Sequence, residues 1–189
     1  LGDVYKRQQM FPSSEYGVVN YIYSIVALAL IILTYGMETG FFRFANHERY
    51  KDPLEVYSTS LISLAVSSTA FLAIVLSLIG PISSAMHCAH HESYVIMMAV
   101  TVAVDAFCCL PFSYLRFRKR PMRFAFLRLV NIGLNIGFNL FFILICPWLW
   151  TQAPGWIAWF YDPDFGIGYI FLANLISSGV TMLLLLPEL

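Results

Sequence analysis

The chain has 189 residues, of which 59% are hydrophobic and only 12% are charged, and its 11 Lys and Arg residues balance 11 Asp and Glu residues. Soluble domains carry about a quarter charged residues, so this composition excludes an ordinary soluble enzyme. No charged residue occurs at positions 56–86 or 129–161. Long apolar runs separated by short charged clusters are typical of a multi-pass membrane protein.

Five apolar segments are long enough to cross about 30 Å of hydrocarbon, which takes about 20 helical residues. The sequence therefore predicts an all-α membrane protein. Proline does not continue a helix, so we expect Gly80-Pro81, Pro147 and Pro187 to end the second, fourth and fifth helices. The predicted helices are 17–39, 56–79, 94–114, 124–145 and 166–186.

The loops predict the orientation of these helices. Loops 43–55 and 116–128 together contain nine Lys and Arg residues, whereas loops 80–93 and 147–165 contain none. Basic loops remain in the cytoplasm. We therefore expect the first helix to run from outside to inside and the chain to end on the cytoplasmic side.

The chain is expected to be a fragment of a longer protein. It begins at Leu1 on the predicted outer side and stops soon after the fifth helix. Residues 1–8 resemble translated sequencing-adapter sequence, so we interpret them as a non-native segment and leave them out of functional reasoning. Residues 9–189 are interpreted as part of a larger helical lobe.

Three stretches resemble the oligosaccharide flippases of the multidrug and polysaccharide exporter superfamily. Residues 35–44, with the sequence YGMETGFFRF, resemble a signature of bacterial polysaccharide flippases. Residues 11–17, FPSSEYG, are similar to the outer loop before that family's second helix. The segment from PFSYLR at 111–116 to FLRLVN at 126–131 is similar to the family's basic connection between helices four and five.

The resemblance implies a MATE-like fold of two six-helix lobes around a central cavity, of which this chain would supply helices two to six of the N-terminal lobe. It also implies the cargo, an oligosaccharide on a polyprenyl diphosphate carrier, moved to the outer leaflet of a bacterial plasma membrane. The expected partners are this lipid-linked oligosaccharide, membrane lipids and other polysaccharide-assembly membrane proteins, with no nucleic acid. No cofactor is expected.

Arg43 is the first candidate for binding the cargo. A charge at the centre of a membrane helix costs about 2.5–3.5 kcal/mol, so such residues point to a transport pathway. The small residues Gly36, Thr39 and Gly40 lie on the same face of a continuing helix as this arginine. They leave room for a diphosphate, whose oxygens a guanidinium binds through two parallel hydrogen bonds. The alternative is an arginine that extends to the lipid headgroups.

Two acidic residues are candidates for coupling transport to an ion gradient. Asp105 lies at the centre of the third predicted helix with no charged residue near it in sequence, so its carboxyl is paired, protonated or part of an ion site. Glu38 lies about 140° around the helix from Arg43, so we expect any basic partner of Glu38 to come from another helix. A structural ion pair is the alternative role for Glu38.

The fourth predicted helix carries Asn131, Asn135 and Asn139 on one stripe, with Gly133 and Gly137 on roughly the opposite side. The glycines would allow close contact with another helix. The asparagines, Asn131 and Asn135 above all, are candidates for binding sugar hydroxyls. Hydrogen bonding between helices is the alternative.

Six basic residues lie between positions 116 and 128. They could capture the carrier diphosphate, or they could fix the topology and contact anionic lipid. Arg123 and Arg128 lie nearest the fourth helix and are the candidates within this group.

A second loop, 87–92, contains three histidines, a cysteine and a glutamate, but we expect no metal site there because histidines in a short loop are commonly solvated.

Three other functions remain open. A multidrug or cation exporter of the same superfamily would need an acidic cavity, which a single buried aspartate with nearby arginines fits less well. A membrane glycan polymerase or ligase would keep reactive polar residues in a large outer loop, whereas the predicted outer loops contain no arginine. A structural membrane subunit would have no need of Arg43 or Asp105.

Overall fold

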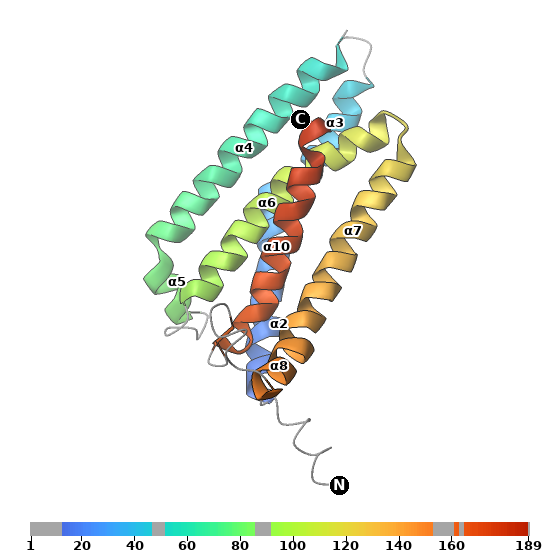
Figure 1. The fold of residues 1–189 in the computed structure, drawn as a ribbon. Helices are drawn as coiled ribbons and strands as arrows, with labels where there is room; N and C mark the ends of the chain where they lie inside the picture. The colour runs from blue at the N-terminus through green and yellow to red at the C-terminus, as the bar shows by residue number, and fades with distance from the viewer. Residues whose placement is uncertain (1–12, 47–51, 86–91, 153–160, 163–164, 189) are drawn as a thin grey trace.

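A computed structural model describes residues 13–46, 52–85, 92–152, 161–162 and 165–188. All regular secondary structure among these residues is helical, and five stretches are long and apolar enough to cross a membrane (Figure 1). The expectation of an all-α, multi-pass membrane protein is therefore confirmed at this level. The five stretches are Asn20–Ala45, Pro53–Ser77, Glu92–Phe117, Pro121–Gln152 and Gly168–Leu185.

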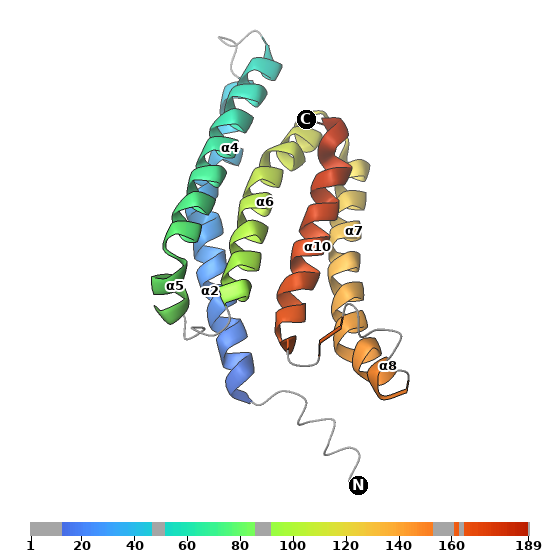
Figure 2. The ribbon, with the colours of Figure 1, turned by 60° about the vertical axis from the view of Figure 1, so that its left-hand side comes forward.

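Helix α6 (Glu92–Phe117) is the centre of the bundle. It contacts α2 (Ser13–Thr34), α4 (Pro53–Ser77), α7 (Pro121–Leu140) and α10 (Gly168–Leu185). Figure 2 shows α2 and α4 on one side of α6 and α10 and α7 on the other. In α6, 61% of the most apolar stretch is buried, against 11% for α4 and 6% for the span that contains α7. The outer helices therefore leave most of their apolar surface for lipid.

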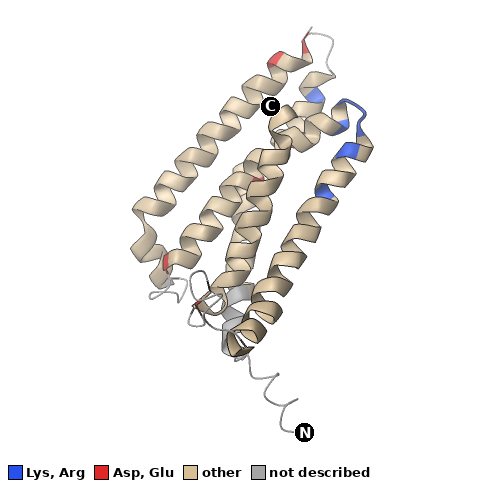
Figure 3. Cartoon of the chain, in the orientation of Figure 1, with Lys and Arg blue, Asp and Glu red and all other residues tan. Residues whose placement is uncertain are grey.

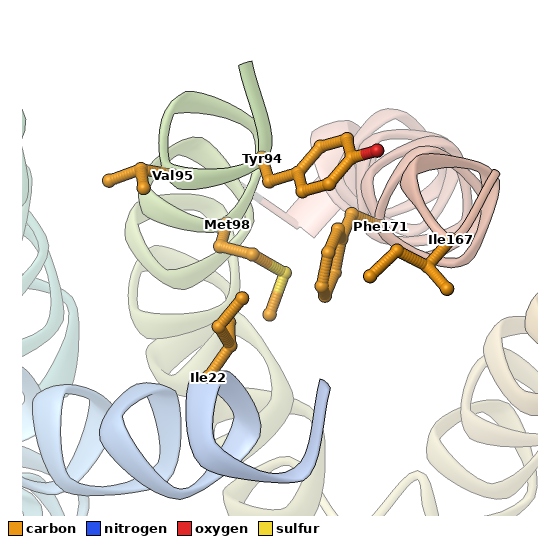
Figure 4. Packing of buried hydrophobic residues seen from close by; sticks show 6 residues of the cluster. All are labelled: Ile22, Tyr94, Val95, Met98, Ile167 and Phe171. Carbon is orange, nitrogen blue, oxygen red and sulfur yellow. The ribbon is translucent and has the colours of Figure 1, made fainter. Parts of the chain in front are cut away.

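One buried cluster joins α2, α6 and α10 at the end of the bundle where α6 begins. Figure 4 shows Met98 and Phe171 pointing toward each other across the space between α6 and α10, with Ile22 of α2 beside Met98. The ring of Phe171 is fully buried, and the Tyr94 hydroxyl donates a hydrogen bond of 2.8 Å to the Phe165 carbonyl oxygen. Apolar packing and this hydrogen bond hold the start of α10 against α6.

The first predicted helix is interrupted. After α2, the backbone of Tyr35 and Gly36 has positive φ angles of 33° and 70°, and α3 (Met37–Ala45) follows as a separate helix. Glycine adopts this left-handed conformation without the steric cost that a Cβ atom brings. The Tyr35 hydroxyl lies 2.9 Å from the Ser63 hydroxyl of α4, which holds the interruption against its neighbour.

This interruption corrects the expected surface around Arg43. Gly36 is the residue before α3 and does not lie on a continuing helix with Arg43. Thr39, Gly40 and Arg43 keep their helical spacing inside α3. The helix also extends past the predicted end at position 39, to Ala45.

The prediction that Gly80-Pro81 ends the second helix is wrong. Helix α4 ends at Ser77, and a short helix, α5 (Ile79–Ala85), contains both Gly80 and Pro81 in its first turn. Proline is tolerated in a first turn because the N–H group that it lacks has no intrahelical partner there.

The fourth span also continues through its proline. Helix α7 passes into a π-helical segment, Phe141–Ile145, and then into α8 (Cys146–Gln152), which contains Pro147 as its second residue. Pro147 was predicted to end the span and does not. At the fifth span the prediction holds, because α10 ends at Leu185 and Pro187 lies in the short 3₁₀ turn that follows.

Aromatic rings pack at the end of the bundle where α10 begins. The ring of Tyr169 stacks on Phe142 of the π-helical segment at 5.0 Å and on Tyr161 at 5.1 Å between centroids. The backbone N–H of Asp162 donates to the Tyr169 hydroxyl at 2.7 Å. Burial raises the pKa of Tyr161 above its ordinary value. These contacts join the fourth and fifth spans at this end.

A substitution at Gly168 tests the packing of α10 on α6. A Cβ atom at Gly168 would lie 2.5 Å from Cε1 of Tyr94 and 2.6 Å from Cε1 of Phe165, whereas a Cβ atom at Gly179 of the same helix would meet nothing within 4 Å. We expect Gly168→Ala to lower the free energy of unfolding by about 1–3 kcal/mol, because the overpacked rings must shift. Denaturant unfolding in micelles measures this. A loss for Gly179→Ala as large as that for Gly168→Ala would contradict the packing.

Candidate functional site

The described basic residues all lie at one end of the bundle, where α6 ends and α7 begins (Figure 3). We call this region the basic end. It draws its side chains from α3, from the last turn of α6, from the connection between α6 and α7, and from α7. Its described members are Arg43, Arg116, Arg118, Lys119, Arg120, Arg123 and Arg128.

Arg116, in the last turn of α6, binds Glu38 of α3. Its Nη2 atom donates to the Oε1 atom of Glu38, and the two residues form the ion pair at the basic end. The guanidinium carbon also lies 5.6 Å from the ring centre of Phe42 and 5.3 Å from that of Phe124. Both charged side chains are about two-fifths exposed, at 39% and 40%, and ion pairs of this kind contribute about 0.2–1 kcal/mol. The pair is open to solvent and exchangeable.

This ion pair confirms the expectation that the partner of Glu38 comes from another helix. Helical spacing places Glu38 on the same side of α3 as the buried residues Phe41 and Ala45, which face the bundle. The second carboxylate oxygen, Oε2, accepts the thiol of Cys109 at 3.7 Å. Glu38 therefore contacts α6 through both carboxylate oxygens.

Arg128, in the second turn of α7, lies over the ring of Phe112. Its guanidinium carbon is 4.4 Å from that ring centre and 6.0 Å from the centre of Phe124. A guanidinium that lies over an aromatic ring gains a cation–π interaction and can still donate hydrogen bonds from its N–H groups. Arg128 is exposed and forms no ion pair with a residue that the structure describes. It is therefore a cation with donors available for an anionic group.

Asp105 lies half-buried in the middle of α6. Its carboxyl accepts a hydrogen bond from the Ser178 hydroxyl of α10 and experiences the charge of Arg128 on α7. Sequence separation hid both partners, because they come from helices that follow α6 in the chain. The carboxyl is thus linked to two neighbouring helices, and a change in the position of either would change its surroundings.

Thr39 and Arg43 lie one turn apart on α3, and both are exposed. Helical spacing puts them on the side of α3 opposite to Phe41 and Ala45. Arg43 forms no ion pair with any residue in the described ranges. Arg123 is exposed in the first turn of α7. These three candidates face away from the packed core.

The asparagine stripe of α7 faces α10. The Asn131 side-chain amide donates to the Thr181 hydroxyl at 2.8 Å, and that of Asn135 donates to the Asn174 amide oxygen at 2.8 Å and reaches the Ser177 hydroxyl at 3.4 Å. Asn139 donates to the side-chain oxygen of Asn135 at 2.9 Å. This polar seam supports the interpretation that the asparagines join helices.

The glycine face of α7 lies on the other side. Gly133 and Gly137 are exposed, and a Cβ atom at either would meet nothing within 4 Å. Within the residues that the structure describes, these glycines therefore do not provide the close helix contact that was expected of them.

The sequence interpretation missed Arg116 as an individual residue. It was counted among the basic residues of a loop, whereas the structure places it on α6 between two aromatic rings and a carboxylate. The sequence signal for Arg116 was its place at the end of a long apolar helix with aromatic residues nearby.

The histidine-rich stretch 87–91 lies outside the described residues, and the described residues contain no group of ligands suited to a metal.

Three cavities of about 280 Å³ each lie apart from the candidate residues. One is lined by α4, α6 and α10 and includes Ser68, the one buried side-chain oxygen without a hydrogen-bond partner in the described part of the chain. A second, between α2, α4 and α6, has an apolar lining, and a third lies beside Glu55 between α3 and α4. None of the three is lined by a predicted candidate residue.

The polar seam predicts a measurable coupling between α7 and α10. We expect Asn135→Ala to lower the free energy of unfolding by about 1 kcal/mol, and a double-mutant cycle with Asn174→Ala to give a coupling energy of about 0.6 kcal/mol. Denaturant unfolding in micelles measures both values. Ile136→Ala, on the exposed side of the same turn, is the control and should show no coupling to Asn174→Ala. Additive losses for Asn135 and Asn174 would contradict the seam.

Comparison with known proteins identifies no relative of this chain. No protein-family model, no curated protein and no solved structure matches the chain. The functional interpretation therefore rests on the residues themselves, and above all on the exposed guanidinium groups that aromatic rings hold at one end of an apolar bundle.

Proposed function

We propose that the chain is part of a flippase that carries an oligosaccharide on a polyprenyl diphosphate across the bacterial plasma membrane. The observation that carries the proposal is the basic end, where exposed arginines border an apolar helical bundle. A lipid-linked sugar has a diphosphate between an apolar tail and a polar glycan, so a cation beside hydrocarbon suits it. The resemblance of residues 35–44 to the flippase signature supports the same cargo.

In this proposal the cargo diphosphate meets the basic end first. Arg128 has N–H donors free at its edge, and Arg123 and Arg43 are exposed at the same end. Thr39, one turn before Arg43, adds a hydroxyl. One lobe then rocks against another, which exposes the bound headgroup to the opposite side, and no covalent bond is made or broken. The protein is therefore proposed to be a transporter and not an enzyme.

Asp105 is the proposed link to an ion gradient. It is the acidic residue in the middle of a span among the described residues, it interacts with Ser178 of α10, and the positive charge of Arg128 acts on it. A proton or sodium ion at this carboxyl would change the attraction between α6 and α7. Glu38 has a structural ion pair with Arg116, so its role in coupling would be secondary.

A cation exporter of the same superfamily is the second candidate, and Asp105 is the observation that favours it. Its cargo would be repelled by the basic end, whereas the anionic cargo would be attracted. The two candidates differ in how they respond to the loss of arginine, since removing positive charge should not harm the transport of a cation.

The cargo assignment predicts which arginines matter in cells. We expect Arg128→Gln and Arg43→Gln in the full-length protein to cause carrier-linked sugar to accumulate on the inner leaflet, because the diphosphate loses charge-assisted hydrogen bonds worth about 1.5–3 kcal/mol each. Sided enzymatic labelling of the glycan measures the accumulation. Arg118→Gln is the control for the loss of one positive charge at the same end, because Arg118 is not one of the proposed diphosphate contacts. Normal export by both variants would overturn the assignment.

Ion coupling predicts a separate effect at Asp105. Replacing Asp105 with Asn keeps the size of the side chain and removes its charge, so flipping in vesicles should lose its dependence on an imposed proton or sodium gradient. Glu92→Gln, at the exposed start of α6, controls for the loss of one acidic charge. Gradient-dependent flipping that survives in the Asp105→Asn protein would rule out this role.

A further inference from the structure

We infer that Arg116 and Arg128, which share the ring of Phe124, form a binding site for a phosphate or diphosphate group, and that Glu38 occupies the Arg116 half of this site when the anion is absent. The inference deepens the proposed function and rests on it for the source of the phosphate. Arg116 was not among the residues predicted to bind cargo.

The two guanidinium groups are held beside one aromatic ring. The guanidinium carbons of Arg116 and Arg128 lie 5.3 and 6.0 Å from the centre of Phe124. Each has a second ring as well, Phe42 at 5.6 Å from Arg116 and Phe112 at 4.4 Å from Arg128. Arg116 donates to the Glu38 carboxylate, and Arg128 forms no ion pair with a described residue, so both guanidinium groups have N–H donors that an anion can take. Because three rings, one each from α3, α6 and α7, restrict the two side chains, less conformational freedom is lost when an anion binds.

Glu38 already shows what the Arg116 half of the site binds. Its carboxylate accepts a hydrogen bond from Nη2 of Arg116, and a carboxylate and a phosphate present oxygens to a guanidinium in the same way. The other oxygen accepts the thiol of Cys109. Glu38 is thus a carboxylate of the protein itself in a position that a phosphate oxygen can take.

Because the Glu38 carboxylate is exposed, a phosphate group can replace it. The Glu38 and Arg116 side chains are 40% and 39% exposed, so solvent and ligand reach the pair. Helix α3 does not depend on this pair for its position, because Phe41 is fully buried against Tyr57, Tyr114 and Phe117. The Glu38 side chain can therefore turn away while α3 stays in place.

Charge favours replacement of the Glu38 carboxylate by a diphosphate. Glu38 supplies one negative charge to Arg116 and makes no ion pair with Arg128. Asp105 attracts Arg128 from the middle of α6, again without forming an ion pair with it. A diphosphate carries more negative charge than one carboxylate and has oxygens on both phosphorus atoms, so it can contact both guanidinium groups. The arrangement therefore prefers a diphosphate over the resident carboxylate.

The test is equilibrium binding of inorganic pyrophosphate to the full-length protein in nanodiscs of neutral lipid. We expect Glu38→Gln to tighten binding by about fivefold, the ratio that an exposed ion pair accounts for, because the competing carboxylate is removed. Arg116→Gln and Arg128→Gln should each weaken binding by about tenfold or more. Glu55→Gln and Arg118→Gln are matched controls for the loss of one charge at the same end. Arg118 lies over Tyr114 and not over Phe124, which the two site arginines share, so both controls should leave binding unchanged.

The outcomes separate this inference from the proposed function. Equal tightening by Glu38→Gln and Glu55→Gln, or equal weakening by Arg118→Gln and Arg116→Gln, would show a general charge effect and overturn the site. If Arg116→Gln does not fold, Arg116→Lys replaces it and should still weaken binding, because an ammonium lacks the planar fork. A second arm uses polyprenyl diphosphate in the nanodisc. Competition between this lipid and pyrophosphate identifies the lipid as the source, whereas pyrophosphate binding without competition keeps the site and contradicts the cargo.

Discussion

The cost of placing polar groups in hydrocarbon is the constraint on which the rest of this structure depends. It explains why the described basic residues gather at one end of an apolar bundle, where their charges reach water and headgroups. It also explains why polar side chains at depth contact one another. Asn135 meets Asn174 between α7 and α10, and Asp105 meets Ser178 between α6 and α10. The interrupted helix at Gly36 obeys the same constraint, because it lies against α4.

Helix α6 connects this constraint to function. Its central place brings the carboxylate of Glu38 from α3 and the guanidinium of Arg128 from α7 to the end where α6 itself supplies Arg116. Aromatic rings lie beside both arginines, whose N–H groups are the donors for an anion. The same helix carries Asp105, so α6 contributes a residue to the proposed ion site and to the proposed anion site. Movement of α7 relative to α6 would affect both sites together.

Much of the fold could be predicted from the sequence, because the length and polarity of a span follow directly from the thickness of the membrane. Helix ends were predicted less well. Pro81 lies in the first turn of α5, where proline is compatible with a helix, and Pro147 follows a π-helical segment within a continuous span. Nothing local distinguishes these positions from a helix end. Contacts between particular residues of different helices could not be predicted from the sequence. Helical spacing excluded Arg43 as the partner of Glu38, but the choice of Arg116, 78 positions away, depends on how α3 packs on α6. The asparagine stripe was recognised, and only packing showed that it faces α10.

The central claim is that the basic end faces the cytoplasm, where an anionic headgroup would be collected. Sided labelling of single cysteines tests it most directly. In the full-length protein with Cys88, Cys108, Cys109 and Cys146 replaced, a cysteine at Lys119, exposed between α6 and α7, is compared with one at Ser93, exposed at the opposite end of α6. A membrane-impermeant maleimide should label position 119 only in inverted vesicles and position 93 only in intact spheroplasts. Labelling of position 119 from the outside would contradict the account.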